Sequence, residues 1–343
     1  MLRHKQDFLT NNRALAARAD ELAALYASQP PRTKCMNCDG DLGPPEFTKR
    51  TIGYAVCDRC GQLNGVHQDT DAFCQAVYAD QGGKQYAQAY GAPDRDAFQQ
   101  RMHDIYVPKA EFLFGALKAE GIAPEGESYA DLGAGSGYFV GALMASGAQS
   151  VTGYEVSEAQ VALADKMLGA GHMSRHGLNE TGSAAAEIGS GVVSMIGVLE
   201  HLQQPRAVLA ALAGNKTVHT VYLSLPLFSP AVYFELIFPD IFPRHLSGGH
   251  THLYTDHSID WMCREYGFKR SSEWWFGADA ADLFRSIRIK LENSDDTAGA
   301  AGRWTEWMEP MIDGLQRVID ERQLASEVHL VLRKRGNKNG RKQ

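Results

Sequence analysis

The chain has 343 residues, a hydrophobic fraction of 44%, and 41 acidic against 34 basic side chains, so its formal net charge is −7. This length suits one large and one small domain, and the negative charge provides no general attraction to nucleic acid or to an acidic membrane surface. The sequence contains neither the apolar core of a signal peptide nor an apolar stretch of membrane length. We therefore expect a cytoplasmic protein with no membrane partner.

The first third of the sequence predicts a helix, a compact turn-rich segment and a helical linker. Residues 1–32 have an Ala- and Leu-rich helical pattern that ends at two consecutive prolines. Residues 33–70 are rich in turn-forming residues and poor in aliphatic side chains, so they cannot build an apolar core of their own. Helical patterns return over residues 71–121, which we interpret as a linker or lid.

Four of the six cysteines stand in two C-x-x-C pairs separated by eighteen residues, and they are Cys35, Cys38, Cys57 and Cys60. In a chain without a secretion signal, such pairs indicate metal ligands before disulfides. Four thiolates match tetrahedral zinc and leave no coordination position open for catalysis. The sequence therefore predicts a structural zinc ribbon in residues 33–70.

Zinc ribbons often bind nucleic acid, and the charge of residues 33–70 bears on whether this ribbon does. Residues 33–70 contain four basic and five acidic side chains. A ribbon that grips phosphates should carry a clear excess of basic residues. The charge balance argues against a nucleic-acid partner, although an RNA methyltransferase that uses the ribbon to hold RNA remains an alternative.

Residues 122–335 alternate between strand and helix patterns. Strands are expected at residues 128–132, 151–154, 192–196, 218–225, 268–276 and 328–332. Such alternation predicts an α/β fold with a Rossmann-like, doubly wound sheet. An irregular insertion at 226–256 and a helical insertion at 278–325 interrupt this core, and residues 336–343 form a basic, solvated tail.

A glycine-rich turn follows the first strand of this core. Gly133, Gly135 and Gly137 at alternate positions let the chain turn tightly and let a ligand approach the bare backbone. Asp131 precedes them, where it would repel a pyrophosphate and attract a cationic ligand. Glu155 ends the next strand, where a carboxylate can accept hydrogen bonds from two ribose hydroxyls. An NAD-binding turn is disfavoured, because its G-x-G-x-x-G spacing would need a glycine at position 138.

The D-x-G-x-G-x-G run resembles the first motif of class I S-adenosylmethionine-dependent methyltransferases, and residues 196–201 resemble the fourth-strand motif of the same family. The resemblance covers about residues 122–276 and the closing strand. It implies that Asp131 and the glycines hold the methionine part of S-adenosylmethionine and that Glu155 holds the ribose. It also places Val156 beside the adenine, Asn179 at its amino edge, and Gly197 and Val198 beneath the transferable methyl. The family often has an aspartate near the position of Asn179, so this contact stays open.

Two histidines are candidates for a catalytic base. Methyl transfer from a sulfonium is an in-line displacement, so the enzyme aligns the nucleophile and sometimes deprotonates it. His201 follows the fourth-strand motif, and His252 lies in the insertion at 226–256, which by the resemblance covers the substrate. The alternatives are that His201 only caps its strand or steadies the cofactor, and that His252 belongs to a second metal site with His250.

The order of ribbon, helical linker and class I core resembles the zinc-containing sugar methyltransferases. That resemblance implies a polar small-molecule acceptor, such as a sugar or nucleotide-linked sugar. A non-catalytic binding module is a third alternative, which the intact glycine motif argues against. The sequence identifies neither the acceptor atom nor the oligomeric state.

Overall fold

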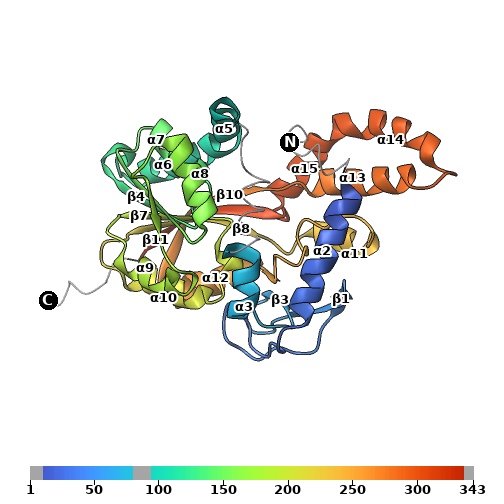
Figure 1. The fold of residues 1–343 in the computed structure, drawn as a ribbon, viewed down its shortest axis with the longest axis horizontal. Helices are drawn as coiled ribbons and strands as arrows, with labels where there is room; N and C mark the ends of the chain where they lie inside the picture. Colours follow the sequence, from blue (N-terminus) through green and yellow to red (C-terminus); the bar gives the residue numbers. More distant parts are fainter. Residues whose placement is uncertain (1–10, 80–93, 336–343) are drawn as a thin grey trace. The chain divides into compact units, whose positions relative to one another are not determined.

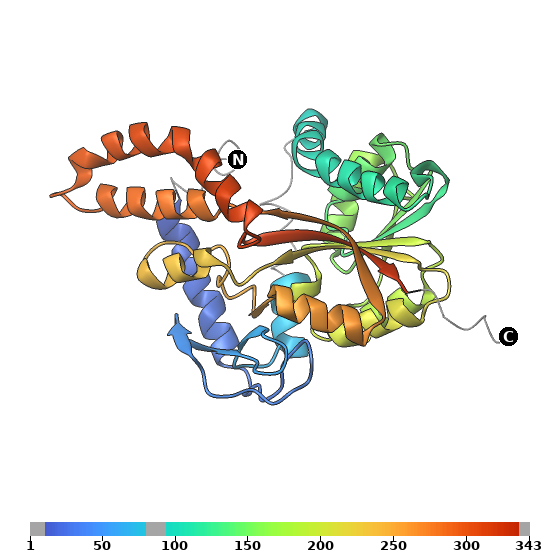
Figure 2. The same ribbon diagram turned by 180° about the vertical axis from the view of Figure 1, so that it is seen from behind.

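The computed structural model describes residues 11–79 and 94–335, which divide into two compact units (Figures 1 and 2). We call the first the ribbon unit, and it comprises the described parts of Met1–Asp69, Leu225–Ser258 and Trp274–Val328. We call the second the sheet unit, and it comprises the described parts of Thr70–Ser224, Ile259–Glu273 and His329–Gln343. The predicted tail, residues 336–343, lies outside the described residues, as do residues 1–10 and 80–93.

A seven-stranded sheet has the order β10-β11-β8-β7-β4-β5-β6. Its strands are β4 (Ser128–Leu132), β5 (Ser150–Glu155), β6 (Met173–Arg175), β7 (Val192–Ile196), β8 (Thr220–Pro226), β10 (Phe268–Phe276) and β11 (Glu327–Lys334). All neighbouring strands from β6 to β8 are parallel. The chain starts at β4, winds outward to β6 and crosses back to β7, which is the doubly wound pattern. The predicted Rossmann-like fold is confirmed.

Helices cover both faces of the sheet. The longer ones are α6 (Val107–Ala119), α7 (Tyr138–Ala145), α8 (Glu158–Leu168), α9 (Thr181–Glu187), α10 (Pro205–Gly214) and α12 (Asp256–Glu265). In Figure 1, α6, α7 and α8 lie on one side of the sheet, and α9 and α10 lie on the other. The aromatic rings of Tyr129, Phe139 and Tyr222 are buried in the core between the sheet and the first group.

The helical linker is built of short pieces, which are α3 (Asp71–Cys74), η2 (Gln75–Ala79), α5 (Arg95–Arg101) and η3 (Met102–Tyr106). The ring of Tyr138, at the start of α7, stacks on Phe98 with 4.3 Å between ring centroids and on Tyr106 with 5.2 Å. These stacked rings fix the second half of the linker to the helix that follows the glycine turn.

A four-stranded antiparallel sheet with the order β1-β2-β3-β9 forms the base of the ribbon unit. Its strands are β1 (Phe47–Lys49), β2 (Ile52–Val56), β3 (Leu63–Gly65) and β9 (His252–Leu253), with helix α2 (Asn12–Ala27) packed beside β2. Leu63 pairs with Leu253, and Asn64 with His252. The segment at 226–256, expected to be an irregular cover, therefore supplies the edge strand of the cysteine-bearing sheet.

Two further elements were not predicted. Strand β6 has only three residues, none of them buried, so it has no apolar run to reveal it. Helix α11 (Pro230–Ile237) begins where Ser229 Oγ accepts a hydrogen bond from the Ala231 N–H at 3.2 Å. Proline at the first helical position after a serine cap is a usual helix start, so the sequence itself carries a signal for this helix.

The predicted helical insertion consists of α13 (Asp279–Glu292), η7 (Ala298–Ala300), α14 (Ala301–Met308), η8 (Glu309–Met311) and α15 (Ile312–Glu321). Phe284 of α13 packs against Trp304, whose Nε1 donates a hydrogen bond to the Phe284 carbonyl at 3.2 Å. None of the described helices combines the length and the apolar character needed to cross a membrane.

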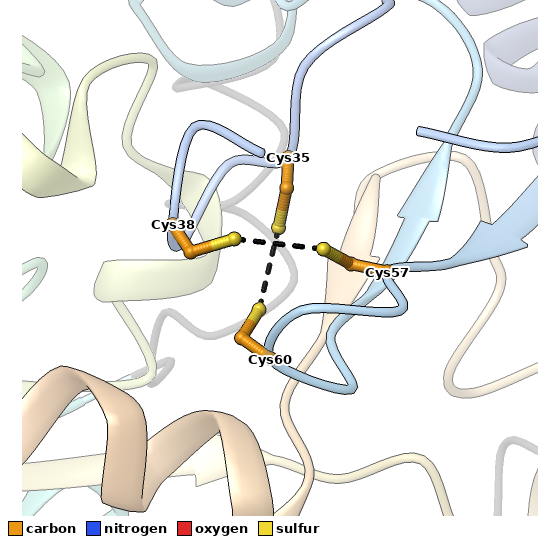
Figure 3. A group of neighbouring side chains, drawn as sticks. All are labelled: Cys35, Cys38, Cys57 and Cys60. Carbon is orange, nitrogen blue, oxygen red and sulfur yellow. Dashed lines mark hydrogen bonds between the residues drawn. The ribbon is translucent and has the colours of Figure 1, made fainter. Parts of the chain in front are cut away.

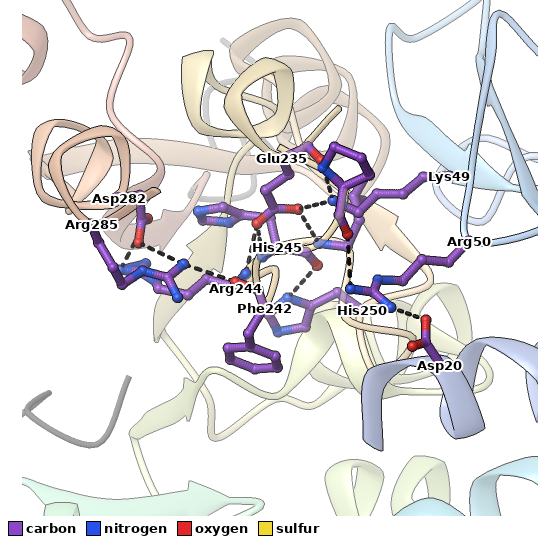
Figure 4. A network of polar contacts seen from close by, with 12 residues as sticks. Asp20, Lys49, Arg50, Glu235, Phe242, Arg244, His245, His250, Asp282 and Arg285 are labelled. Carbon is purple, nitrogen blue, oxygen red and sulfur yellow. Dashed lines mark hydrogen bonds and ion pairs between the residues drawn. The ribbon is translucent and has the colours of Figure 1, made fainter. Parts of the chain in front are cut away.

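A buried polar network joins α11 to the ribbon (Figure 4). The Glu235 carboxylate accepts hydrogen bonds from the backbone N–H groups of Arg244, His245 and Leu246 at 2.6 to 3.1 Å. Lys49 Nζ lies 3.3 Å from the same carboxylate. Burial alone would raise the pKa of Glu235, but Lys49 and these N–H groups hold it below its usual value. The carboxylate therefore stays charged and orders the chain that leads to β9.

Candidate functional site

The turn after β4 has a backbone that only glycine adopts readily. Gly133, Gly135 and Gly137 have φ values of 72°, 54° and 79°, in the left-handed region. A Cβ atom on Gly133 would lie 2.6 Å from Val198 Cγ2, and one on Gly137 would lie 2.8 Å from Leu168 Cδ1. The turn therefore combines a left-handed backbone with close packing. Because its glycines have no Cβ atoms, its backbone is not covered by their side chains.

Glu155 ties this turn to the end of β5. Its Oε1 accepts hydrogen bonds from the N–H groups of Val156 and Ser157, both at 2.9 Å, and its Oε2 accepts one from the Gly135 N–H at 2.8 Å. Burial raises the pKa of Glu155, while the three N–H groups act to lower it. The carboxylate is thus held in one orientation at the mouth of the glycine turn.

Asp131 lies behind the turn, at the end of β4. It is 2% exposed, and its Oδ1 accepts a hydrogen bond from Ser194 Oγ at 2.6 Å. Burial raises the pKa of Asp131 to about 7, although the Ser194 hydrogen bond opposes the shift. Because the pKa of this buried carboxyl lies near neutral pH, a nearby cation would favour its ionised form.

A cavity in the sheet unit opens beside the turn. Its lining includes seven predicted site residues, which are Gly133, Gly135, Glu155, Val156, Gly197, Val198 and His201. It also includes six residues that the sequence did not single out as site residues, which are Tyr78, Gln160, His176, Leu178, Thr181 and Leu202. Asp131, Gly137 and Asn179 do not belong to the lining. The cavity runs from the glycine turn to the imidazole of His201.

The imidazole of His201 is held from one side by a tyrosine. Its Nδ1 and the Tyr78 hydroxyl share a hydrogen bond of 3.1 Å, and the two rings lie 5.2 Å apart between centroids. Nε2 lies 3.9 Å from Oε1 of the buried Glu200. Since the side chain of His201 is 20% exposed, the ring is oriented by its neighbours and still reachable from the cavity.

Asn179 is exposed, and its Nδ2 donates a hydrogen bond of 3.4 Å to Asp71 Oδ2. Its neighbours Leu178 and Thr181 face the cavity instead. His176 also lines the cavity, and its Nε2 contacts Thr181 Oγ1 at 3.2 Å. The sequence did not reveal His176 because the strand that precedes it, β6, was not recognised.

His252 lies in β9 of the ribbon unit and is fully buried. Its Nδ1 is 3.4 Å from Thr251 Oγ1, and its ring meets Tyr254 edge-on at 5.7 Å. Burial lowers the pKa of His252 to about 3, with smaller contributions from Arg32 and His250. An imidazole of such low basicity is a weak proton acceptor near neutral pH.

The four predicted metal ligands come together in the ribbon unit (Figure 3). The sulfur atoms of Cys35, Cys38, Cys57 and Cys60 all lie within 4.8 Å of one another and point toward one centre. Two of the separations are 3.6 Å, between Cys35 and Cys60, and 3.5 Å, between Cys38 and Cys57. Tetrahedral zinc with Zn–S bonds of ~2.3 Å places its sulfurs about 3.8 Å apart. The donor set and its spacing therefore fit one tetrahedral zinc ion.

Hydrogen bonds to sulfur surround this cluster. The Gly40 N–H points to Cys38 Sγ at 3.4 Å, and Asn64 Nδ2 points to Cys35 Sγ at 3.6 Å. Such outer contacts orient thiolates and stabilise their negative charge. Asn64 also pairs with His252 in the sheet, so its side chain contacts the cysteine cluster while its strand contacts β9.

Several solved structures of methyltransferases are similar to this chain. Magnesium protoporphyrin IX methyltransferase from Synechocystis PCC 6803, with bound SAH, is 15% identical, and the match covers 78% of this chain and 100% of that one with a TM-score of 0.47. An O-methyltransferase family protein from Burkholderia thailandensis is 12% identical over 76% of this chain and 64% of that one, with a TM-score of 0.41. A SAM dependent methyltransferase from Archaeoglobus fulgidus is 15% identical over 66% and 94%, with a TM-score of 0.39. No curated protein sequence matches the chain.

A family model described as a methyltransferase domain matches residues 98–273. The match spans more than half of the chain and includes the glycine turn, Glu155 and His201. The chain belongs to this methyltransferase domain family and has the Rossmann-like class I fold of S-adenosylmethionine-dependent methyltransferases.

Proposed function

We propose that this methyltransferase acts on a polar small molecule, a sugar or a nucleotide-linked sugar. The observation that carries the proposal is the cavity of the sheet unit, which joins the glycine turn and Glu155 to the oriented imidazole of His201. A carboxylate suited to ribose and a histidine suited to an acceptor hydroxyl thus line one continuous space. The ribbon's near-neutral charge gives RNA no comparable site.

The proposed cofactor contacts follow the order of residues around the cavity. Oε1 of Glu155 already accepts two backbone N–H groups, so Oε2, which accepts one, is the oxygen we assign to the ribose hydroxyls. Asp131 and the three glycines would receive the methionine end. Val156 would flank the adenine, and Gly197 and Val198 would lie beneath the methyl group. Asn179 would reach the amino edge of the adenine only after its side chain turns away from Asp71.

When bound, S-adenosylmethionine supplies a methyl group on a positively charged sulfur. The residues of the chain have two tasks. They hold the acceptor oxygen in line with that methyl group, and they accept the proton that the oxygen loses. We assign the proton to His201 Nε2: in the tautomer whose Nδ1–H donates to the Tyr78 hydroxyl, Nε2 is the nitrogen with a lone pair. His252 was the other candidate, and its burial makes His201 the better base.

Replacing Glu155 by alanine is expected to weaken binding of S-adenosylhomocysteine by about 2–3 kcal/mol, because two ribose hydroxyls lose their acceptor in a buried site. Isothermal titration calorimetry measures this change. Glu158→Ala is the matched control, since that carboxylate lies nearby but is exposed and paired with Arg175. Equal affinity for the Glu155 variant and the wild type would remove the ribose assignment.

Replacing His201 by alanine is expected to lower turnover by ~10²-fold or more while cofactor affinity stays unchanged. Tyr78→Phe keeps the ring contact and removes only the hydrogen bond to Nδ1, so a smaller loss of turnover is expected. His103→Ala, at an exposed position on η3, is the control. If turnover on the true acceptor survives in the His201 variant, alignment alone carries the reaction and the base assignment is withdrawn.

The acceptor class is tested by transfer of an isotope-labelled methyl group to three sets of candidates, which are free sugars, nucleotide-linked sugars and RNA. We expect label in a sugar set and none in RNA, at both low and moderate salt. Label in RNA, together with binding that weakens steeply as salt is raised, would replace the sugar proposal with the RNA alternative.

We also propose that the four cysteines hold one structural zinc ion, as their sulfur spacing and their hydrogen-bonded surroundings support. With four thiolates in place, no position remains for water or substrate. The ion would join the two C-x-x-C turns and supply the stability that a segment with few aliphatic residues lacks.

A further inference from the structure

The cavity of the sheet unit lies at the carboxyl ends of four parallel strands, in the order β7-β4-β5-β6. The glycine turn follows β4 and Glu155 ends β5, so both lie in the middle of this row. The loops after β6 and β7 stand on either side and line the cavity, the first through Leu178 and Thr181 and the second through His201 and Leu202. Three strand spacings of ~4.8 Å separate the two outer strands by about 14 Å. The two outer loops are therefore opposite walls of the cavity.

One side chain from outside the sheet joins these two walls. The Asp71 carboxylate accepts a hydrogen bond from Gln203 Nε2 at 2.7 Å and one from Asn179 Nδ2 at 3.4 Å. Asn179 belongs to the loop after β6, and Gln203 follows the short helix after β7. The connection from Asn179 through Asp71 to Gln203 therefore spans the carboxyl ends of β4 and β5, where an open parallel sheet binds its ligand.

The helical segment that begins at Asp71 reaches the cavity again at its other end. We call residues 71–79 the strap, and it consists of α3 and the π-helix η2. Tyr78, near its end, lines the cavity and shares a hydrogen bond with His201. One face of the strap is buried, with exposures of 1%, 1% and 4% for Phe73, Cys74 and Val77. Short π-helical turns are frequent at functional sites. The strap thus contacts the walls of the cavity through both of its ends.

The Asp71 side chain is not needed as a helix cap. Thr70 already caps α3, since its hydroxyl accepts a hydrogen bond from the Phe73 N–H at 3.2 Å. The Asp71 carboxylate is turned toward the two walls instead. Its partners are exposed or half-buried, so water competes for the same donors and the two bonds break readily. A segment held at one end by such bonds opens without unfolding of the sheet.

We propose that the strap closes the cavity over the bound cofactor and that the Asp71 carboxylate holds it shut. The proposal rests on the proposed cofactor site in this cavity. When the bonds of Asp71 break, the strap moves aside, so that S-adenosylmethionine enters and S-adenosylhomocysteine leaves. The shorter bond, to Gln203, involves no residue assigned to the cofactor, so it forms with and without the cofactor. It therefore controls the rates of entry and release more than the affinity.

The rates of ligand exchange test this role of Asp71. Surface plasmon resonance on the full chain, with S-adenosylhomocysteine as the probe, measures both rate constants. Asp71→Ala is expected to raise the association and dissociation rate constants together, each by about 5–10-fold, and to change the dissociation constant by less than about threefold. Asp71→Asn keeps an oxygen that can accept from Gln203, so its rates should fall in between. Asp96→Ala is the matched control, because Asp96 is also an exposed acid in the first turn of a helix.

A double substitution tests whether Asp71 acts through Gln203. Gln203→Ala removes the partner of the shorter bond and no residue assigned to the cofactor or the acceptor. It should raise both rate constants nearly as much as Asp71→Ala does. The variant with both substitutions should exchange ligand no faster than Asp71→Ala, because the two changes remove the same bond. Effects that multiply in the double variant overturn the proposal that this bond holds the strap shut.

A reversible cross-link tests the strap in the opposite direction. In Asp71→Cys with Gln203→Cys, a short bifunctional methanethiosulfonate reagent should tie the strap to the wall and slow both entry and release of S-adenosylhomocysteine by at least about tenfold. Dithiothreitol should restore both rates. All six native cysteines are buried, and the two single-cysteine variants, treated in the same way, are the controls.

The outcomes separate this proposal from the cofactor site on which it rests. A wild-type chain that does not bind S-adenosylhomocysteine overturns both. If the wild type binds, exchange rates that change neither in Asp71→Ala nor on cross-linking overturn the strap alone. A weaker affinity of Asp71→Ala with an unchanged association rate also overturns it, because Asp71 would then act on the bound ligand and not on its entry.

Discussion

Removing the metal from the four-cysteine cluster, by chelation or by Cys57→Ser, is expected to unfold the ribbon and to release β9 with it. Binding of structural zinc by small cysteine sites is worth on the order of 10 kcal/mol, and that binding energy is also folding energy. Strand β3 directly follows the second C-x-x-C turn and is hydrogen-bonded to β9. Loss of the ion is therefore expected to disorder residues 252–253 as well as the cysteine turns.

Hydrogen exchange and elemental analysis measure this outcome. We expect one zinc per chain, and after its loss faster exchange in β3 and β9 but unchanged exchange in β4 and β7 of the sheet unit. Cys74→Ser is the matched control, because Cys74 is buried but stands outside the cluster, so it should leave the zinc content intact. Absence of zinc in protein purified without chelator, or protected β9 amides after zinc removal, would contradict the prediction.

Lowering the pH from 7 to 4 is expected to destabilise the ribbon unit strongly. Burial lowers the pKa of His250 to about 4 and that of His252 to about 3, and it also lowers the pKa of His245. These histidines are neutral in the folded state and take up protons near pH 6.5 once unfolded. Their contribution to stability is therefore present above pH 6.5 and is lost as the pH falls. His250 and His252 should each cost about 3 kcal/mol by pH 4.

Other buried groups modify this dependence in known directions. The pKa of Glu235 lies below its usual value, so protonating it in acid adds to the loss of stability. Burial raises the pKa of Asp69, which offsets part of the loss in the same unit. In the sheet unit, Asp131 and Glu155 both have raised pKa values, which favours its folded state in acid, and burial lowers the pKa of His176, which offsets part of this effect. The sheet unit should therefore lose less stability in acid than the ribbon unit.

Urea unfolding at a series of pH values, followed by hydrogen exchange of β9 and β4, separates the two responses. His252→Gln cannot take up the proton and should reduce the pH slope of the ribbon unit by about one proton between pH 6.5 and 4, or ~1.4 kcal/mol per pH unit. Because this variant keeps all four cysteines, the comparison isolates the histidine from acid release of metal. His103→Gln, at an exposed site, should leave the slope unchanged. A wild-type stability that is flat over this range would show that these histidines are not buried neutral in solution.

The residues whose arrangement is local could be predicted from the sequence by itself. The glycine turn needs left-handed backbone at three alternate positions, and glycine is the residue that adopts it without strain. Glu155 follows from the same logic, since it ends the strand next to the turn. The C-x-x-C pairs likewise form two short turns whose spacing is typical of zinc sites. Local backbone preference and fixed spacing carry all of this information.

Only the tertiary structure showed which distant segments meet and which side chains become buried. Tyr78 lies far from His201 in the sequence, and no periodicity could pair them. β9 is a two-residue strand, recognisable only through its partner β3. His201 and His252 were equal candidates in the sequence, yet His201 borders a cavity and His252 is fully buried in a sheet. Burial decides the basicity of an imidazole, and burial depends on long-range packing that a one-dimensional pattern does not encode.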